Sequence, residues 1–255
     1  MNIIERTRRT FVLFLLLAGV VVNAVAQERR PQHKPYIDLR PMHFGISVGL
    51  NMQDIELQNV GPQLFDLGDG EPPTEQLALC DADTWNPGFS VGVVADMRLG
   101  QHFALRLSPT MHFGSKHLVF RDFKDLNDYG QPRESTQDLK NTYISIPIGL
   151  KFSAERFNNY RPYIIAGISP MINLSGKDQD YIHLKRYDTM AEVGLGCDYY
   201  LPFFKFIPEL KFSFSLSDVF DKSHVDELTD ATKQAFARSV NGGCSKMVTL
   251  TFYFE

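Results

Sequence analysis

Alternation of apolar and polar side chains with a period of two runs through most of the sequence after Arg40. This period is that of a β-strand, in which successive side chains point to opposite faces. Eight segments show it: 43–52, 89–99, 103–113, 142–152, 162–174, 190–201, 204–216 and 246–254. The pattern therefore predicts an all-β fold of eight strands, the last of which ends beside the final residue, Glu255.

One face of each predicted strand carries no charged residue. On the closing strand this face holds Val248, Leu250, Phe252 and Phe254. The opposite faces are rich in Gly, Ser and Thr and hold few charged residues, which are Asp96, Arg98, Arg106, Lys151, Glu192, Asp198, Lys205, Glu209 and Lys211. A soluble β-sandwich alternates in the same way, so the period alone leaves open both a soluble exported β protein and a membrane β-barrel.

Strand length and the rhythm of the connections favour the membrane barrel. Strands of about 10 residues, tilted near 45°, cross the hydrocarbon layer, whereas globular strands average about 5–6 residues. Long connections at 53–88, 114–141, 175–189 and 217–245 alternate with short ones, as external loops alternate with periplasmic turns in outer-membrane barrels. We therefore predict an eight-stranded antiparallel transmembrane up-and-down β-barrel over residues 42–255, whose last strand closes against its first.

The N-terminal residues have the features of an export signal. Residues 1–26 combine a basic start with an apolar run at 11–22, too short for a membrane-spanning helix, and a small-residue cleavage site at Ala24-Val25-Ala26. An uncleaved anchor is the alternative. Residues 27–41 are polar and interrupted by proline, which predicts a flexible periplasmic extension. The chain holds 26 Lys and Arg against 30 Asp and Glu, and this acidic balance argues against a nucleic-acid partner.

Charges on the polar face are expected to pair inside the barrel. Eight strands leave an interior that side chains fill, and buried charges need partners. If Leu99 pairs with Phe103, Asp96 lies opposite Arg106; if Leu201 pairs with Phe204, Glu209 and Lys211 lie opposite two glycines, Gly196 and Gly194, which leave room for long side chains. We favour a structural role over a proton or ion path for the lumen charges Asp96, Arg106, Glu192, Asp198, Glu209 and Lys211.

Two of the three cysteines lie in predicted external loops. Cys80 and Cys244 flank the seam between the first and last strands, and we predict a disulfide between them; free thiols or an intermolecular bridge are the alternatives. Cys197 falls on the lipid face. In the last loop, 217–245, the apolar spacing predicts a short helix near 224–240, which would act as a lid or a docking surface. The first loop, 53–88, is acidic but lacks the spacing of a calcium loop, so no metal or other cofactor is expected.

No constellation of catalytic residues is evident. The sequence lacks G-x-S-x-G, H-E-x-x-H and C-x-x-C, and neither His, Ser nor an acidic residue falls on the lipid face. We therefore predict that the protein is not an enzyme and takes no small-molecule substrate.

Four stretches resemble the PorT (SprT) family: "KPYIDLRPMHFGISVGLNMQDIEL", "ISIPIGLKF", "RPYIIAGISPMINL" and "RSVNGGCSKMVTLTFYFE". The resemblance covers nearly all of 34–255. It implies a nonenzymatic outer-membrane β-barrel of the type IX secretion and gliding motility system, required for the export of cargo proteins. Its implied partners are other secretion components and outer-membrane lipid, with both termini in the periplasm. The alternatives are a generic barrel that serves as anchor or adhesin and, third, a lipid-modifying barrel enzyme.

Overall fold

The computed structural model describes residues 33–61, 63–65, 74–76, 78–126, 132–175, 184–220 and 240–255. The predicted signal peptide and nearly all of the predicted helix near 224–240 lie outside these residues. The described elements are one short 3-10 helix and thirteen strands: η2 (Ile37–Leu39), β1 (Met42–Asn59), β2 (Gln63–Phe65), β3 (Thr74–Gln76), β4 (Ala78–Thr84), β5 (Asn86–Arg98), β6 (Phe103–Leu107), β7 (Thr110–Leu126), β8 (Pro132–Ser145), β9 (Ile148–Ser153), β10 (Tyr160–Asn173), β11 (Tyr187–Tyr200), β12 (Lys205–Ser215) and β13 (Val240–Phe254).

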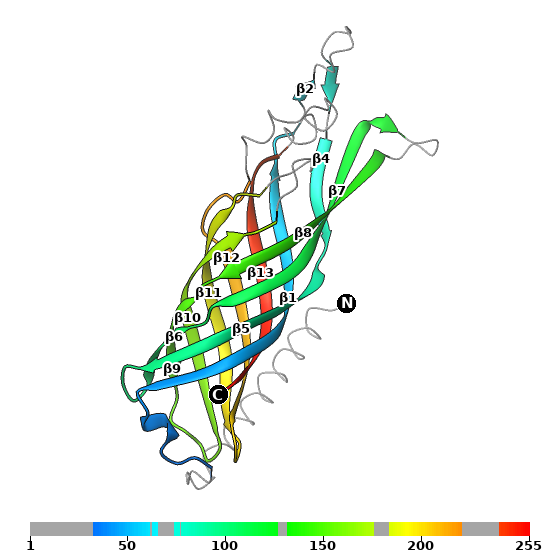
Figure 1. Ribbon diagram of the computed structural model, residues 1–255. Coiled ribbons are helices and arrows are strands. Elements are labelled where there is room, and N and C mark those ends of the chain that lie inside the picture. The colour runs from blue at the N-terminus through cyan, green and yellow to red at the C-terminus, as the bar shows by residue number, and fades with distance from the viewer. Residues whose placement is uncertain are drawn as a thin grey trace, which may run out of the picture.

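Eleven of the strands form one antiparallel sheet that closes into a barrel (Figure 1). The barrel has eight strand positions. β1, β5, β10, β11, β12 and β13 each fill one position, β6 and β7 together fill the one after β5, and β9 and β8 together fill the one before β10. The last strand pairs with the first from Ile46 opposite Phe254 to Asn59 opposite Val240. The predicted eight-stranded barrel is therefore confirmed, and its closure leaves no free edge between the chain's first and last strands.

Two prolines divide two of the eight positions. Pro109 separates β6 from β7, and Pro147 separates β9 from β8. Proline has no N–H to donate to the ladder, but its carbonyl still accepts: Val93 N–H donates to Pro109 O, Ser108 N–H to Pro147 O, and Ile146 N–H to Pro170 O on β10. The three prolines therefore lie on three neighbouring positions of the wall and are joined by successive hydrogen bonds.

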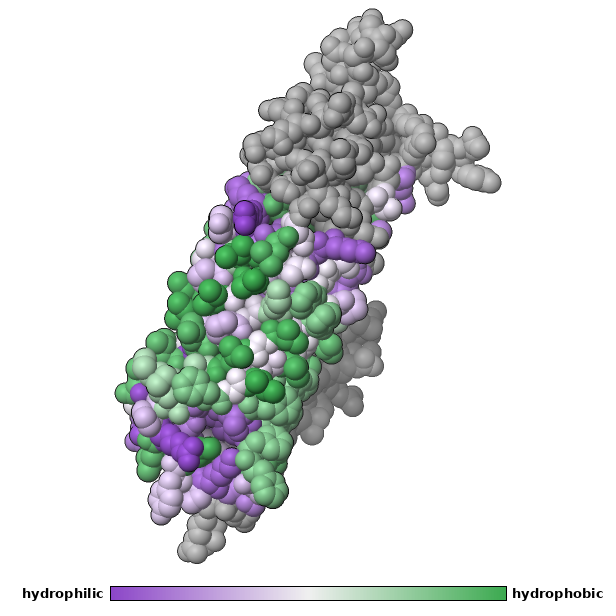
Figure 2. Space-filling view, in the orientation of Figure 1, coloured by the Kyte–Doolittle hydropathy of each residue, from purple (hydrophilic) through white to green (hydrophobic). Residues whose placement is uncertain are grey.

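The outward face is an apolar belt, and the inward face is polar. Phe44, Ile46 and Leu50 on β1 are each at least 60% exposed, while the alternating Ser47 and Asn51 are buried. Figure 2 shows hydrophobic residues over the middle of the barrel and hydrophilic ones gathered toward its ends. The assignment of faces along the strands, including Phe252 and Phe254 on the outward side, agrees with the period-two pattern.

At one end of the barrel, strands continue well past the belt. β7 and β8 pair from Thr110 opposite Ser145 to Leu126 opposite Pro132, and β4 pairs along β7 from Ala78 opposite Asp122. The prediction of a loop at 114–141 is therefore wrong for most of its length, because both sides of the connection keep their ladder hydrogen bonds outside the belt. Figure 1 shows this three-stranded sheet projecting from the barrel.

The two ends of the barrel differ in content. The terminal end carries η2, the short turns and Glu255, and the loop end carries β2 to β4 and the tips of β7 and β8. Within the described residues, no helix has the length and apolar character required to cross a bilayer.

Candidate functional site: a charged lumen with an apolar cap

The centre of the lumen charges is Arg106, whose side chain is buried. Its guanidinium donates to both carboxylate oxygens of Asp96, Nε to Oδ1 at 2.6 Å and Nη2 to Oδ2 at 2.7 Å. Nη1 donates to Glu209 Oε2 at 2.7 Å and to the Tyr163 hydroxyl at 3.0 Å. Asp96 lies directly opposite Arg106 in the β5–β6 register, as predicted, and Glu209 reaches the same cation from the far side of the ring.

Two tyrosines complete the coordination of Glu209, which is fully buried. Tyr163 Oη donates to Oε2 at 2.7 Å and Tyr253 Oη to Oε1 at 2.9 Å. The predicted pairing of Glu209 with Gly196 and of Lys211 with Gly194 is confirmed. The room at Gly196 serves Tyr163 rather than a charged side chain, because a Cβ there would lie 2.3 Å from the Tyr163 ring.

A second row of charges extends the network toward the terminal end. Lys151 Nζ lies 2.8 Å from Asp198 Oδ1 and 3.5 Å from Asp96 Oδ2. Lys205 pairs with Glu255, the last residue, and lies 3.9 Å from Asp198. On the other side of Arg106, Lys211 lies 3.2 Å from Glu192 and 3.4 Å from Glu209.

All six predicted lumen charges therefore join one network, together with three that the candidate set omitted, Lys151, Lys205 and Glu255. Lys151 and Lys205 lie on the polar face that the sequence predicts, as do the six predicted charges. The place of Glu255 follows from the same parity, since Tyr253 and Thr251 also point inward. Each of these buried cations has a carboxylate within 4.0 Å, which is the condition for burying charge at tolerable cost. The arrangement supports a structural role.

Above the ion network the lumen is lined by small polar groups. His112 is hydrogen-bonded through Nδ1 to Ser90 Oγ at 2.8 Å and through Nε2 to Ser145 Oγ at 2.9 Å. Asn51 Nδ2 also donates to Ser90 Oγ, at 2.8 Å. A serine hydrogen-bonded to a histidine resembles part of the catalytic triad of serine hydrolases. Among the described residues, however, no carboxylate contacts the His112 imidazole, and both serines are buried inside the barrel.

An apolar cluster closes the lumen at the loop end. It is built from strands and loops all around the ring, so its members meet across the interior: Ile55, Cys80, Leu118, Phe120, Leu184, Val219, Phe220 and Val240. Asn59 fixes β4 in this cap, since its side chain donates to Cys80 O and accepts from Cys80 N–H, both at 2.9 Å.

The predicted disulfide between Cys80 and Cys244 is not formed; all three cysteines are free thiols. The physical reason is strand parity. Cys80 points into the apolar cap and is buried, whereas Cys244 lies opposite Glu56 on the outward face of β13. The two thiols are therefore on opposite sides of the barrel wall. Burial, and secondarily the charge of Asp81, raise the pKa of the Cys80 thiol, which keeps it protonated.

Lys116, just below the cap, differs from the other buried cations. Its Nζ lies 2.8 Å from Ser245 Oγ and 3.5 Å from Tyr143 Oη, and no carboxylate lies within 4.0 Å among the described residues. The residue stands beyond Phe113, where the apolar belt ends on β7. Burial lowers its pKa to about 8, against a smaller opposing effect of Asp188 and Asp54.

At the terminal end, residues 33–41 form a strap that is held against the barrel, in contrast to the flexible extension expected there. Asp38 accepts a hydrogen bond of 2.6 Å from Tyr200 Oη and lies 3.6 Å from Arg156 and 3.9 Å from Arg161. Arg156 also donates to the carbonyls of His33 and Lys34, and its guanidinium lies 3.6 Å from the centre of the Tyr200 ring.

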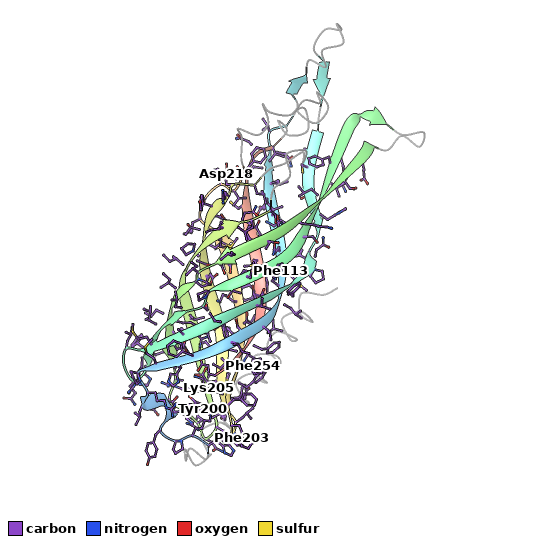
Figure 3. The ribbon with its side chains drawn as sticks, viewed as in Figure 1. Phe113, Tyr200, Phe203, Lys205, Asp218 and Phe254 are labelled. Carbon is purple, nitrogen blue, oxygen red and sulfur yellow. The ribbon has the colours of Figure 1, made fainter. Side chains whose placement is uncertain are left out.

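The strap attaches to a second turn as well. Lys34 Nζ donates to Phe203 O at 2.7 Å, and Figure 3 shows Tyr200, Phe203 and Lys205 at this same end. Beside the strap, a cleft with about 410 Å³ of empty space opens to solvent, with Asp38, Arg161 and the lumen charges in its lining. Asp38, Asp96, Lys151, Arg161, Asp198 and Lys205 in this lining have oppositely charged partners, whereas Arg98 donates to the backbone carbonyl of Gly100 at 3.2 Å.

No group of three or more His, Cys, Asp or Glu side chains in the described part of the chain is arranged to hold a metal ion.

Comparison with known proteins agrees with this architecture. Residues 25–221 match the family described as "Outer membrane protein beta-barrel domain". The outer membrane protein OprG from Pseudomonas aeruginosa is similar in structure, with 12% identity, a TM-score of 0.45, and coverage of 83% of this chain and 91% of that one. Neisserial surface protein A (NspA) is also similar, with 10% identity, a TM-score of 0.39, and coverage of 84% and 98%. No curated protein matches the chain.

Proposed function

The chain belongs to the family of outer membrane protein β-barrel domains, and from this premise we propose that it is a nonenzymatic component required for type IX protein secretion. In this role it acts through contacts with other secretion components and does not itself conduct cargo. The observation that carries the proposal is the closed lumen. An apolar cap fills one end, a network of ion pairs fills the other half, and eight strands leave an interior only wide enough for side chains.

A barrel that passes nothing must work through its surfaces. The resemblance of residues 34–255 to the PorT family supports secretion as the process that those contacts serve, and extends to gliding motility. In the same proposal the terminal end faces the periplasm and the projecting sheet of β4, β7 and β8 faces outward, as in barrels with short periplasmic turns and long external loops.

The strap offers the better-defined contact surface. Tyr36 is 76% exposed and Leu39 59% exposed on η2, and Phe203, whose carbonyl binds Lys34, is 89% exposed. These three apolar side chains lie at the end proposed to face the periplasm. Exposed aromatic and apolar residues held by a rigid support are typical of interaction surfaces.

The experiment distinguishes the loss of a contact surface on the strap from a failure of the barrel to assemble. Deleting 28–40 would also remove Asp38 and leave Tyr200, Arg156 and Arg161 without this partner. Tyr36→Ser/Leu39→Ser is the sharper change, because neither side chain is buried. We expect the barrel to assemble at normal levels and secretion of cargo proteins to fall severely. Val60→Ser/Trp85→Ser removes two comparably exposed apolar residues at the loop end and serves as the matched control, with secretion retained.

Normal secretion after clean deletion of the whole gene would defeat the proposal. The generic anchor or adhesin would then take its place if adhesion or envelope integrity fails instead. Altered lipid A or phospholipid acylation in the deletion strain would favour the lipid-modifying enzyme.

A further inference from the structure

We propose that the barrel rim at the loop end binds the phosphate groups of lipid headgroups through Lys140, Lys185 and Arg186, here called the rim site. The inference rests on the proposed function in one respect, the outward orientation of the loop end. In that orientation the ligand is the phosphorylated glycolipid of the outer leaflet, lipopolysaccharide.

The three cations come from two segments on either side of β10: Lys140 lies on β8, and Lys185 and Arg186 lie just before β11. Asn173 on β10 lies opposite Tyr143 on β8, and its N–H donates to Arg186 O, just before β11, at 2.7 Å. Leu174 N–H donates to Thr142 O at 2.9 Å, two residues from Lys140. β8, β10 and β11 therefore stand side by side where they leave the belt, and the rim site occupies one continuous stretch of the rim.

The rim site lies directly above exposed apolar surface. Tyr187 is 66% exposed on the outward face, and Leu174 is 50% exposed beside it. The guanidinium carbon of Arg186 lies 6.0 Å from the centre of the Tyr187 ring. Tyrosine rings in outer-membrane barrels form a girdle at the membrane interface, so this contact holds Arg186 at the level of the lipid headgroups.

The rim site consists of exposed cations. Lys140, Lys185 and Arg186 are exposed, and none forms an ion pair within the described residues. Lys185 Nζ donates only to a backbone carbonyl, that of Asp218, at 2.8 Å; Figure 3 shows Asp218 at the loop end. Two other exposed cations at this end do have carboxylates: Lys246 pairs with Glu56, and Arg121 with Glu134.

Two carboxylates close to the rim site, those of Asp188 and Asp218, accept hydrogen bonds from neutral groups. Asp188 accepts hydrogen bonds from Ser215 Oγ and from Thr189 N–H, both at 2.7 Å. Asp218 accepts from the backbone N–H groups of Phe220 and Gly243. Within the described residues the rim site therefore presents cations that have no ion-pair partner, at the level of the bilayer interface, where guanidinium and ammonium groups bind phosphate oxygens.

The test uses the purified full-length protein in phosphatidylcholine nanodiscs, with lipid A added and bound lipid counted by native mass spectrometry. We expect Lys140→Gln/Lys185→Gln/Arg186→Gln to bind lipid A about 10- to 100-fold more weakly, because each cation near an anionic surface contributes about a fivefold factor. Lys246→Gln is the matched control, since its charge is already balanced by Glu56, and it should bind as the wild type does. Lipid A without phosphates should bind the wild type no better than lipid A binds the triple variant.

Unchanged affinity of the triple variant, or equal binding of phosphate-free lipid A, overturns the rim site. Equal affinity for phosphatidylglycerol and lipid A overturns the assignment to the glycolipid leaflet. Heat-modifiable migration on gels verifies that each variant is folded, and Lys140→Gln alone, on the surface of β8, should give a partial loss if the triple variant does not fold. If the triple variant binds lipid A more weakly but the deletion strain secretes normally, the rim site is supported and only the proposed secretion role is rejected.

Discussion

Asp96 and Arg106 face each other across the β5–β6 pair and share two parallel hydrogen bonds inside the lumen. The pair is not isolated, since Arg106 also holds Glu209 from β12. One guanidinium thus links strands on opposite sides of the ring, which makes Arg106 the side chain on which the interior depends most.

Arg106→Met should destabilise the barrel by about 3–5 kcal/mol, because two buried carboxylates lose their hydrogen-bonded cation and each keeps only a lysine 3.4–3.5 Å away. Adding Asp96→Asn should recover part of that loss, so the double variant should be less destabilised than the sum of the singles by about 0.5–3 kcal/mol. Urea unfolding in phospholipid vesicles measures each value. Arg121→Met, which breaks an exposed pair, is the control and should change stability by less than about 1 kcal/mol. Simple additivity in the cycle would contradict the pairing.

Lys116 should make stability depend on pH. Its folded pKa of about 8 lies below the ordinary lysine value of 10.5. Between these values the unfolded chain binds more protons than the folded one, so stability should rise as pH increases from 8 to 10.5. Lys116→Met should flatten this rise relative to wild type in matched unfolding curves. Parallel curves for the two proteins would show that the Lys116 ammonium is not buried.

The two loop-end cysteines should react differently. In native, unreduced membranes, Cys244 should be alkylated by a maleimide quickly, since it is exposed, whereas Cys80 should react only after unfolding, since it is buried and its pKa is raised. Peptide mapping identifies the labelled sites, and Cys244→Ser supplies the blank. Recovery of a linked Cys80–Cys244 peptide would overturn the arrangement of the cap.

Ile146 tests the lipid face. Its side chain is 42% exposed on the outward side of the wall. Ile146→Arg should cost about 2–4 kcal/mol near the middle of the bilayer, whereas Ile146→Leu should be nearly neutral. Unfolding in vesicles measures both. An arginine tolerated there would mean that this surface does not face lipid.

Orientation can be tested with epitope tags. A tag inserted between Leu126 and Pro132 should be reached by antibody on intact cells, and a tag at Gly100, in the β5–β6 turn, only after the outer membrane is broken. Gly100 is a suitable position because nothing lies within 4 Å of a Cβ built there, so an added side chain meets no neighbour. The reverse result would invert the proposed topology.

The sequence alone predicted the features that depend on the period of the strands and on tight turns. Parity assigned the faces, and the short turn between Leu99 and Phe103 set the register that brings Asp96 to Arg106. Contacts across the lumen could not be read in this way. The ion pair between Arg106 and Glu209 depends on the stagger and tilt of all the strands in the barrel. The alternation of side chains along one strand contains no information about either.

The errors have similar physical causes. The disulfide was inferred from loops that flank one seam, but Cys244 is still on a paired strand, so its parity decides its side. The strap at 33–41 was expected to be flexible because of its polar composition. Asp38 holds it in place through Tyr200, Arg156 and Arg161, which are distant in sequence and give no local signal.

Three neighbouring prolines of the wall have a consequence for how the barrel opens. Pro109, Pro147 and Pro170 are consecutive in a chain of hydrogen bonds, and each removes one donor from its ladder. Below the base of the projecting β7–β8 hairpin, the wall thus has a row of positions with fewer hydrogen bonds between neighbouring strands. Transient separation of the strands should begin along this row, while the ion network on the terminal side and the long β1–β13 closure stay intact. Motion of the β7–β8 hairpin should therefore be mechanically separated from the rest of the ring.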